Sequence, residues 1–299
     1  MTPMNSPEAN MFLDARPRLF AAAYRMLGTV SDAEDILQEA YLRWQTVAMD
    51  TVRDPVGYLM RITTRLCLDR LKSARVKREV YPGEWLPEPV LTGGSVEALD
   101  HDVSVALLLA LERLTPLERV AFLLHDVFDC DYDEVALTLG RSEASCRQLT
   151  TRARRHVQES KPRAAVDDEQ GAAMVEAFFM ASKSGDTSVL AKLLTKDVQL
   201  ISDGGGKAIA ALNPIVGQDH VVRFFEGLSR KLDGFIPKHW KLCQLNGLPA
   251  IVSGEIDGIV QTTALEIVGG KIHRIYVVRN PDKTQHLVET LNGNEGPRL

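Results

Sequence analysis

Residues 31–44 carry apolar side chains at helical spacing, and this pattern constrains the first part of the chain more tightly than any other. One stripe of such a helix holds Ala33, Ile36, Leu37, Ala40 and Trp44. The opposite face holds Asp32, Asp35, Glu39, Leu42 and Arg43. A solvated face does not need a leucine among its charges, whereas a face that docks on a partner does. The stretch therefore predicts an amphipathic helix whose outer face is either plain surface or a docking face.

Two signals place the start of this helix at Ser31. Ser31 and Glu34 have the spacing of a capping box, in which each residue satisfies a free backbone N–H group of the other. The acidic residues of the first turn also suit the positive end of the helix dipole. We therefore expect Ser31 to be the N-cap.

Length and composition limit the classes of protein to which the chain can belong. With 299 residues, 45% hydrophobic and 25% charged, it should form two or three globular domains. The formal charge of -5 means that any case for nucleic-acid binding depends on local clusters. The four cysteines are scattered, which predicts reduced thiols in a cytosolic protein without disulfides or a metal site. No leader and no membrane-spanning run is recognisable, so we expect a soluble, cytoplasmic protein that does not bind membranes.

The pattern from Phe12 to Lys77 is helical, with Gly28 ending one helix and Asp54-Pro55 starting another. The polar side of the last helix is basic and carries hydroxyl groups; its site candidates are Arg61, Thr64, Arg65, Arg70, Lys72 and Arg75. Cations and hydroxyls together are typical of phosphate contacts, although a basic solvated helix has the same composition. We take residues 8–79 as the first domain.

Residues 80–102 predict a linker. Three prolines between Tyr81 and Pro89 exclude a helix and favour an extended path. Trp85 and Leu86 are too apolar for a free spacer, so we expect them to pack on a folded neighbour. This packing either covers the nearest domain or forms a regulatory clasp.

Residues 103–160 predict a second helical domain. Thr115 to Glu118 form a capping box with proline at the first helical position. A short helix from Tyr132 to Leu139, a turn at Gly140-Arg141 and a longer helix capped by Ser142 predict a helix-turn-helix. The outward face of the longer helix holds Arg147, Gln148, Thr151, Arg152, Arg154 and Arg155. Arginine and glutamine read guanine and adenine edges, so this face predicts a contact with double-stranded DNA.

Beyond a polar linker at residues 161–169 the pattern changes from all-helical to mixed. Strands are expected at residues 198–202, 239–245, 250–255, 259–268 and 271–279, and helices at residues 175–181, 189–194 and 217–232. Gly269-Gly270 predicts a two-residue hairpin turn. The fold class is therefore multidomain: two all-α domains, followed at residues 170–299 by an α+β domain whose curved antiparallel sheet curls around helices.

Several of these stretches resemble one family. Asp32 to Trp44 (D-A-E-D-I-L-Q-E-A-Y-L-R-W) resembles region 2 of bacterial sigma factors of the extracytoplasmic-function (ECF) type, and Arg141 to Val157 resembles their region 4. Three motifs resemble a subgroup with a fused C-terminal SnoaL-like domain: W-L-P-E-P at 85–89, D-G-G-G-K at 203–207 and N-P-D-K at 280–283. The resemblance covers nearly the whole chain past Glu8.

The resemblance implies a factor that binds core RNA polymerase and directs promoter-specific transcription initiation. Asp32, Asp35, Glu39, Leu42 and Arg43 would dock on the clamp coiled coil of the β′ subunit. The basic tract of Arg61, Thr64, Arg65, Arg70, Lys72 and Arg75 would engage the −10 element. The −35 element would be read by Ser145, Arg147, Gln148, Thr151, Arg152, Arg154 and Arg155. At Arg65 many relatives carry asparagine, which leaves the −10 preference open.

The SnoaL-like domain leaves room for several roles. Some relatives are enzymes, and the polar candidates here are Asp203, Lys207, His239, Arg279, Asp282 and Lys283. None of these forms a pair at defined spacing that identifies a general base, so we expect no catalysis, no cofactor and no metal. The glycines after Asp203 could make only a flexible turn, and their spacing is not that of a P-loop.

Our preferred hypothesis is a regulatory clasp. The C-terminal domain would pack against the first helical domain and the linker, and so set the distance between the two DNA-reading units. The residues proposed for the clasp are Trp85, Leu86, Pro87, Asp203, Lys207, Asn280, Asp282 and Lys283. A small-molecule ligand in the cone is a second hypothesis, and the free protein is expected to be a monomer. The rival is a helix-turn-helix regulator fused to a SnoaL-like isomerase or cyclase, which would have no use for an acidic docking helix.

Overall fold

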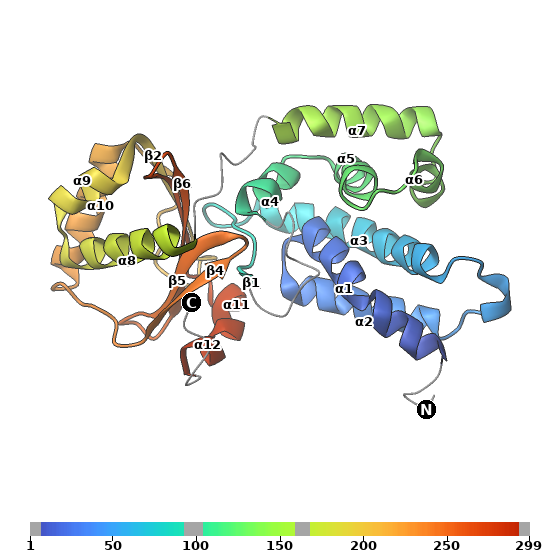
Figure 1. Cartoon of the computed structure of the whole chain (residues 1–299), viewed down its shortest axis with the longest axis horizontal. Coiled ribbons are helices and arrows are strands. Elements are labelled where there is room, and N and C mark those ends of the chain that lie inside the picture. The colour runs from blue at the N-terminus through green and yellow to red at the C-terminus, as the bar shows by residue number, and fades with distance from the viewer. Residues whose placement is uncertain (1–6, 93–103, 159–167, 293–299) are drawn as a thin grey trace. The chain divides into compact units, whose positions relative to one another are not determined.

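The computed structural model describes residues 7–92, 104–158 and 168–292, and they form two compact units (Figure 1). The helical unit contains helices α1 to α7. The C-terminal unit contains everything from α8 onward and also residues 80–92, which precede α4 in the sequence. Most of the linker expected before the second helical domain therefore belongs to the C-terminal unit.

The first helical group consists of α1 (Pro7–Leu27), α2 (Val30–Trp44) and α3 (Pro55–Glu79), with the short 3-10 turn η1 (Met49–Thr51) before α3. The apolar stripe predicted for residues 31–44 is the buried face of α2. Trp44 is completely buried, and its indole Nε1 donates to the carbonyl of Glu8 at 2.9 Å. The stripe therefore fixes α2 against α1, which leaves the opposite face of α2 exposed.

The predicted N-cap of α2 is wrong. The helix begins at Val30 and its N-cap is Thr29, not Ser31. Gly28 adopts a left-handed conformation with φ of 75°, which ends α1 and lets the chain turn directly into α2. The hydroxyl of Thr29 donates to Asp32 at 2.7 Å and makes no side-chain cap to the backbone. Because of this glycine turn, α2 begins closer to α1 than the Ser31–Glu34 spacing predicts.

The second helical group consists of α4 (Val105–Glu112), α5 (Pro116–Phe122), the π-helical turn η3 (Leu123–Val127), α6 (Tyr132–Leu139) and α7 (Glu143–Gln158). The capping box of Thr115 and Glu118 is present as predicted. Gly140 ends α6 in the left-handed conformation, and the hydroxyl of Ser142 accepts from the backbone N–H of Ser145 at 3.3 Å. The predicted helix-turn-helix geometry of α6 and α7 is therefore confirmed.

The C-terminal unit is an α+β fold, as expected. Its helices are α8 (Asp168–Ser184), α9 (Thr187–Leu193), α10 (Gln218–Lys231), α11 (Pro281–Thr284) and α12 (Val288–Asn292), with a 3-10 turn η4 (Gln285–Leu287). The strands are β1 (Leu91–Thr92), β2 (Leu194–Asp203), β3 (Ile215–Val216), β4 (Trp240–Leu245), β5 (Leu248–Gly254), β6 (Val260–Val268) and β7 (Lys271–Val278). They form one sheet in the order β1-β4-β5-β6-β7-β2-β3.

This sheet is antiparallel except where β2 pairs with β7 in parallel, a pairing that the sequence did not predict. Gly269 and Gly270 both have positive φ, as the predicted hairpin turn between β6 and β7 requires. The linker strand β1 extends one edge through its pairing with β4. The sheet therefore includes a strand from residues far upstream of the domain.

The two faces of the sheet are covered differently. Helices α8, α9 and α10 pack on the inner face around a core that includes Phe178, Phe179, Val221 and Phe225. The rings of Phe178 and Phe225 meet edge to face, with centroids 5.3 Å apart. Helices α11 and α12 lie on the other side of the sheet (Figure 1). The outer face is thus covered by the C-terminal helices, next to the point where the linker enters.

The core contact of Phe178 predicts a local loss of stability when it is truncated. Phe178→Ala should destabilise the C-terminal unit by about 3–5 kcal/mol, because it removes a buried ring from a packed core. Hydrogen exchange of peptides from β6 and β7 would measure the loss. Met180→Ala is the matched control in α8, since Met180 is 41% exposed and its truncation should change stability by less than about 0.5 kcal/mol.

Candidate functional sites

The outer face of α2 presents a leucine among charges. Leu42 is 58% exposed. Glu39 and Arg43, both exposed, form an ion pair of 2.6 Å on the same face. Arg70 of α3 lies 3.1 Å from Asp35 and 3.4 Å from the half-buried Asp32. This exposed apolar side chain within a mixed, mainly acidic rim is suited to docking on a protein partner.

The predicted basic tract lies on α3, but its members differ in accessibility. Arg65 and Lys72 are exposed, and Arg61 lies over the ring of Tyr58 at 5.6 Å. Arg70 is turned toward the acidic residues of α2, as described above. Thr64 does not belong to this surface, because it is fully buried and its hydroxyl has no hydrogen-bond partner among the described residues. The backbone of Arg75 belongs to α3, but its side chain lies outside the described part of the structure.

The outward face of α7 carries the predicted DNA-reading residues. All six of them are exposed: Arg147, Gln148, Thr151, Arg152, Arg154 and Arg155. Three of the arginines are oriented by carboxylates, with Arg147 bound to Glu143, Arg152 to Glu118 and Arg154 to Asp126. Ser145, at the start of the helix, is half-buried. The exposed guanidinium groups make this face of α7 basic, although three of them are paired with acids.

The polar centre of the C-terminal unit is the carboxylate of Asp203, at the end of β2. Asp203 is completely buried and accepts four hydrogen bonds. Two come from the linker: the Tyr81 hydroxyl at 2.6 Å and the Leu86 backbone N–H at 2.9 Å. The others come from the Gly205 backbone N–H at 3.0 Å and the Lys283 ammonium at 2.7 Å. A carboxylate has about four acceptor sites, so Asp203 is fully satisfied.

Lys283 completes this centre from α11. Its side chain is only 6% exposed, and the ammonium also donates to the carbonyl of Leu86 at 2.5 Å. The Trp85 ring lies 4.2 Å from the same nitrogen, so the cation is held between a carboxylate and an aromatic face. Burial and the hydrogen bond to Asp203 raise the pKa of Tyr81. The buried Asp203–Lys283 pair therefore binds the linker both before Trp85, at Tyr81, and after it, at Leu86.

The three glycines after Asp203 are required by close contacts. A Cβ on Gly205 would lie 2.3 Å from Nδ2 of Asn280, which donates to the Tyr81 hydroxyl. A Cβ on Gly206 would lie 2.9 Å from Pro82 of the linker. Gly205 and Gly206 also have positive φ. The D-G-G-G-K motif therefore packs closely against the linker and its partner Asn280. The interpretation of these glycines as only a flexible turn is wrong.

Further contacts fix the rest of the linker, and sequence reasoning missed them. His286 lies 3.3 Å from Glu88 through Nδ1 and 2.9 Å from the Pro89 carbonyl through Nε2. The Asn246 side chain accepts from the Val90 backbone N–H at 3.1 Å, just before β1 joins the sheet. Single histidines and asparagines in loops carry no pattern that would have identified these roles. The residues predicted for the clasp gather around the linker itself, except that Lys207 and Asp282 form an exposed ion pair nearby.

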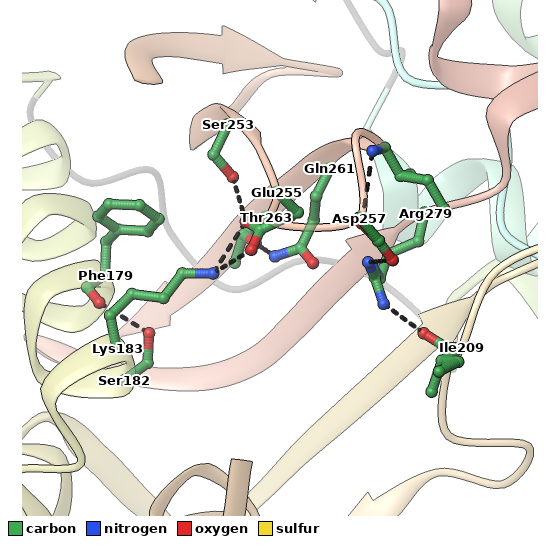
Figure 2. Close-up of polar contacts among 11 residues, drawn as sticks. Phe179, Ser182, Lys183, Ile209, Ser253, Glu255, Asp257, Gln261, Thr263 and Arg279 are labelled. Atoms are coloured by element: carbon green, nitrogen blue, oxygen red, sulfur yellow. Dashed lines mark hydrogen bonds and ion pairs between the residues drawn. The ribbon is translucent and has the colours of Figure 1, made fainter. Parts of the chain in front are cut away.

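A second polar cluster lies on the inner face of the sheet (Figure 2). Lys183 reaches from α8 to Glu255 and binds both carboxylate oxygens, at 2.7 and 2.8 Å. Arg279 donates to Asp257 at 2.7 Å and to the Ile209 carbonyl at 2.6 Å. Each acid is thus already paired with a cation, and the predicted candidate His239 is exposed. The cluster does not bring a free base together with an orienting partner, as general base catalysis requires.

Each of the two helical groups matches the model of a known protein family. The family model for Sigma-70 region 2 matches residues 11–76, and the model for Sigma-70 region 4 matches residues 104–157. The ECF RNA polymerase sigma factor SigJ of Mycobacterium tuberculosis is 40% identical over 293 residues, spanning 92% of this chain and 93% of SigJ. The chain belongs to the ECF RNA polymerase sigma factors.

Other similarities of this ECF sigma factor extend through the C-terminal unit. The probable ECF RNA polymerase sigma factor SigI of Mycobacterium tuberculosis is 33% identical over 295 residues, spanning 93% of this chain and 95% of SigI. The crystal structure of Mycobacterium tuberculosis SigJ matches with a TM-score of 0.73 and 36% identity, covering 92% of this chain and 98% of SigJ. The fused α+β domain is thus shared with these relatives.

None of the described helices is long and apolar enough to cross a membrane. No group of three or more histidine, cysteine or acidic side chains among the described residues could hold a metal ion.

The buried pair of Asp203 and Lys283 predicts a large effect of removing its cation. Lys283→Met should destabilise the C-terminal unit by about 3–5 kcal/mol, because it leaves a buried carboxylate without its counter-ion. It should also expose residues 80–90 to protease. Lys207→Met is the matched control, since its pair with Asp282 is solvent-exposed and contributes about 0–1 kcal/mol. Equal effects of the two variants in urea unfolding and limited proteolysis would contradict the assignment.

Proposed function

We propose that this ECF sigma factor brings core RNA polymerase to its promoters by docking the outer face of α2 on the clamp coiled coil of the β′ subunit. The exposed Leu42 within its charged rim is the observation that carries this assignment. Asp35, Glu39 and Arg43 would set the orientation of docking, and Asp32 would support it from the edge of the face. Since sigma factors act on the polymerase, we propose a cytoplasmic location.

Two basic surfaces would contact the double-stranded promoter. On α3, Arg61, Arg65, Arg70, Lys72 and Arg75 would engage the −10 element, while the burial of Thr64 removes it from this set. On α7, Gln148 and the exposed arginines would read the −35 element, with Ser145 and Thr151 supporting contacts to the backbone. The separation of charge explains how a chain of net charge -5 can bind DNA locally.

The docking proposal predicts a specific loss of polymerase affinity. Leu42→Ser should weaken binding to core RNA polymerase by about tenfold or more, because burying a leucine side chain contributes about 1.5–3 kcal/mol. Fluorescence anisotropy of the labelled chain with core polymerase would measure this. Leu13→Ser is the control, because Leu13 is 57% exposed on α1. Unchanged affinity of Leu42→Ser would reject α2 as the docking helix.

We propose that the C-terminal domain regulates initiation in cis by holding the linker between the two helical groups. Residues 80–92 would be anchored on the C-terminal unit by Asp203 and Lys283. An anchored linker limits the separations that the two promoter-binding surfaces can adopt, which links the state of this domain to promoter geometry. Trp85, Leu86, Pro87 and Asn280 contribute packing and hydrogen bonds to the anchor.

Freeing the linker should broaden the range of promoters used. In vitro transcription on templates whose −10 to −35 spacer is changed one base pair at a time should show a sharp optimum for the native chain. The optimum should broaden for Lys283→Met but not for Lys207→Met. Deleting residues 170–299 should also change promoter-specific transcription. Unchanged spacer preference in both Lys283→Met and the deletion would reject regulation through the linker.

We propose that the C-terminal domain acts as this holder and not as an enzyme. The candidate groups Asp203 and Lys283 bind each other and the linker. Glu255 and Asp257 are likewise already bound, by Lys183 and Arg279. A ligand that used these groups would have to displace one of the pairs, and thermal-shift screening would detect such binding. The rival, an operator-binding regulator fused to an enzyme, predicts that the chain does not co-purify with core polymerase.

A further inference from the structure

The two helical groups are joined by arginine side chains that cross between them. Arg65 of α3 donates through Nη2 to the carbonyl of Leu137 at 3.2 Å and through Nε to that of Thr138 at 3.4 Å. These carbonyls belong to the last turn of α6, where a helix has no backbone N–H groups left to satisfy them. A cation at this end also interacts favourably with the helix dipole. A residue of the proposed −10 surface thus caps the first helix of the helix-turn-helix.

A second crossing lies between α1 and the end of η3. Arg18 donates to the carbonyl of Phe128 at 2.9 Å. Arg25, only 4% exposed, lies over the ring of Phe128 at 5.5 Å from its centroid. The Phe128 carbonyl directly follows η3, so it is again the end of a helical segment that receives the arginine.

The third crossing runs in the opposite direction. Arg119 of α5 donates to the carbonyl of Met26 in the last turn of α1 at 2.6 Å, and to Glu112 at 2.7 Å. Its side chain is 3% exposed, and burial lowers the pKa of Arg119 to about 9. Arg119 stays charged near neutral pH, so this contact is a hydrogen bond from a cation to a carbonyl at the C-terminal end of α1.

We propose that Arg18, Arg65 and Arg119 form a latch that holds the two helical groups closed in the free protein, and that promoter DNA opens it by recruiting Arg65. All three arginines use the same chemistry, a guanidinium on carbonyls at the end of a helical segment in the opposite group. Arg65 cannot cap α6 and contact a promoter at the same time, so DNA and the latch compete for one side chain. The promoter half of this inference rests on the role of Arg65 proposed above.

The latch is tested first without polymerase. Spin labels on genetically encoded residues at the exposed positions Asp14 of α1 and Asp133 of α6 would report the distance between the groups in the full-length chain. The native chain should give one narrow distance distribution. Arg18→Gln combined with Arg65→Gln should raise the ratio of open to closed molecules by about tenfold or more, since charged hydrogen bonds are lost.

Arg16→Gln is the matched control for the distance measurement. Arg16 is also exposed on α1, but it binds Glu34 within the first helical group and does not cross. Unchanged circular dichroism would verify that each variant is folded. A double variant that keeps the native distance distribution, or an Arg16→Gln variant that broadens it equally, would overturn the latch.

A transcription assay then tests the promoter half. Arg18→Gln weakens the latch but leaves Arg65 in place, so it should reach half-maximal initiation at lower promoter concentration than the native chain or Arg16→Gln. Equal promoter requirements for all three would show that the latch does not compete with DNA. If the native chain fails to initiate with core polymerase, the proposed function and the promoter half fail together. The distance measurement then decides the latch alone.

Discussion

The ion pair of Asp203 and Lys283 is the interaction on which the C-terminal unit depends. A buried carboxylate is unfavourable unless it is paired and hydrogen-bonded, and here half of its four partners come from the linker. The domain and the linker therefore need each other: without residues 81–86 the carboxylate would lose two donors, and without Lys283 it would lose its counter-ion. This mutual requirement explains why the linker is folded as part of the sheet domain.

Much of the architecture could be predicted because it depends on local chemistry. The stripe of α2, the capping box at Thr115 and the glycines of the β6–β7 turn each act over a few residues, and the structure has all of them. The start of α2 was predicted wrongly, because Gly28 in a left-handed conformation brings the helix start forward. The parallel pairing of β2 with β7 joins strands far apart in the chain, and no local pattern encodes it.

The same distinction applies to the candidate sites. Exposure of Leu42 and of the α7 arginines follows from helical periodicity, so sequence alone could place them. Burial of Thr64 depends on how three helices pack, and the partners of His286 and Asn246 depend on the path of the linker. The motifs at 85–89, 203–207 and 280–283 were recognisable as motifs. Their meeting around one carboxylate could be known only from the fold.

The strand β1 has a consequence for how such proteins can be recombined. It comes from the chain between the two helical groups, yet it pairs with β4 of a domain that is synthesised after both of them. The C-terminal domain is therefore not an independent appendage that could be grafted onto another sigma factor at its own N-terminal boundary. A domain exchange between sigma factors that keeps the sheet complete must transfer residues 80–92 together with the C-terminal domain, as two segments that are separate in the sequence.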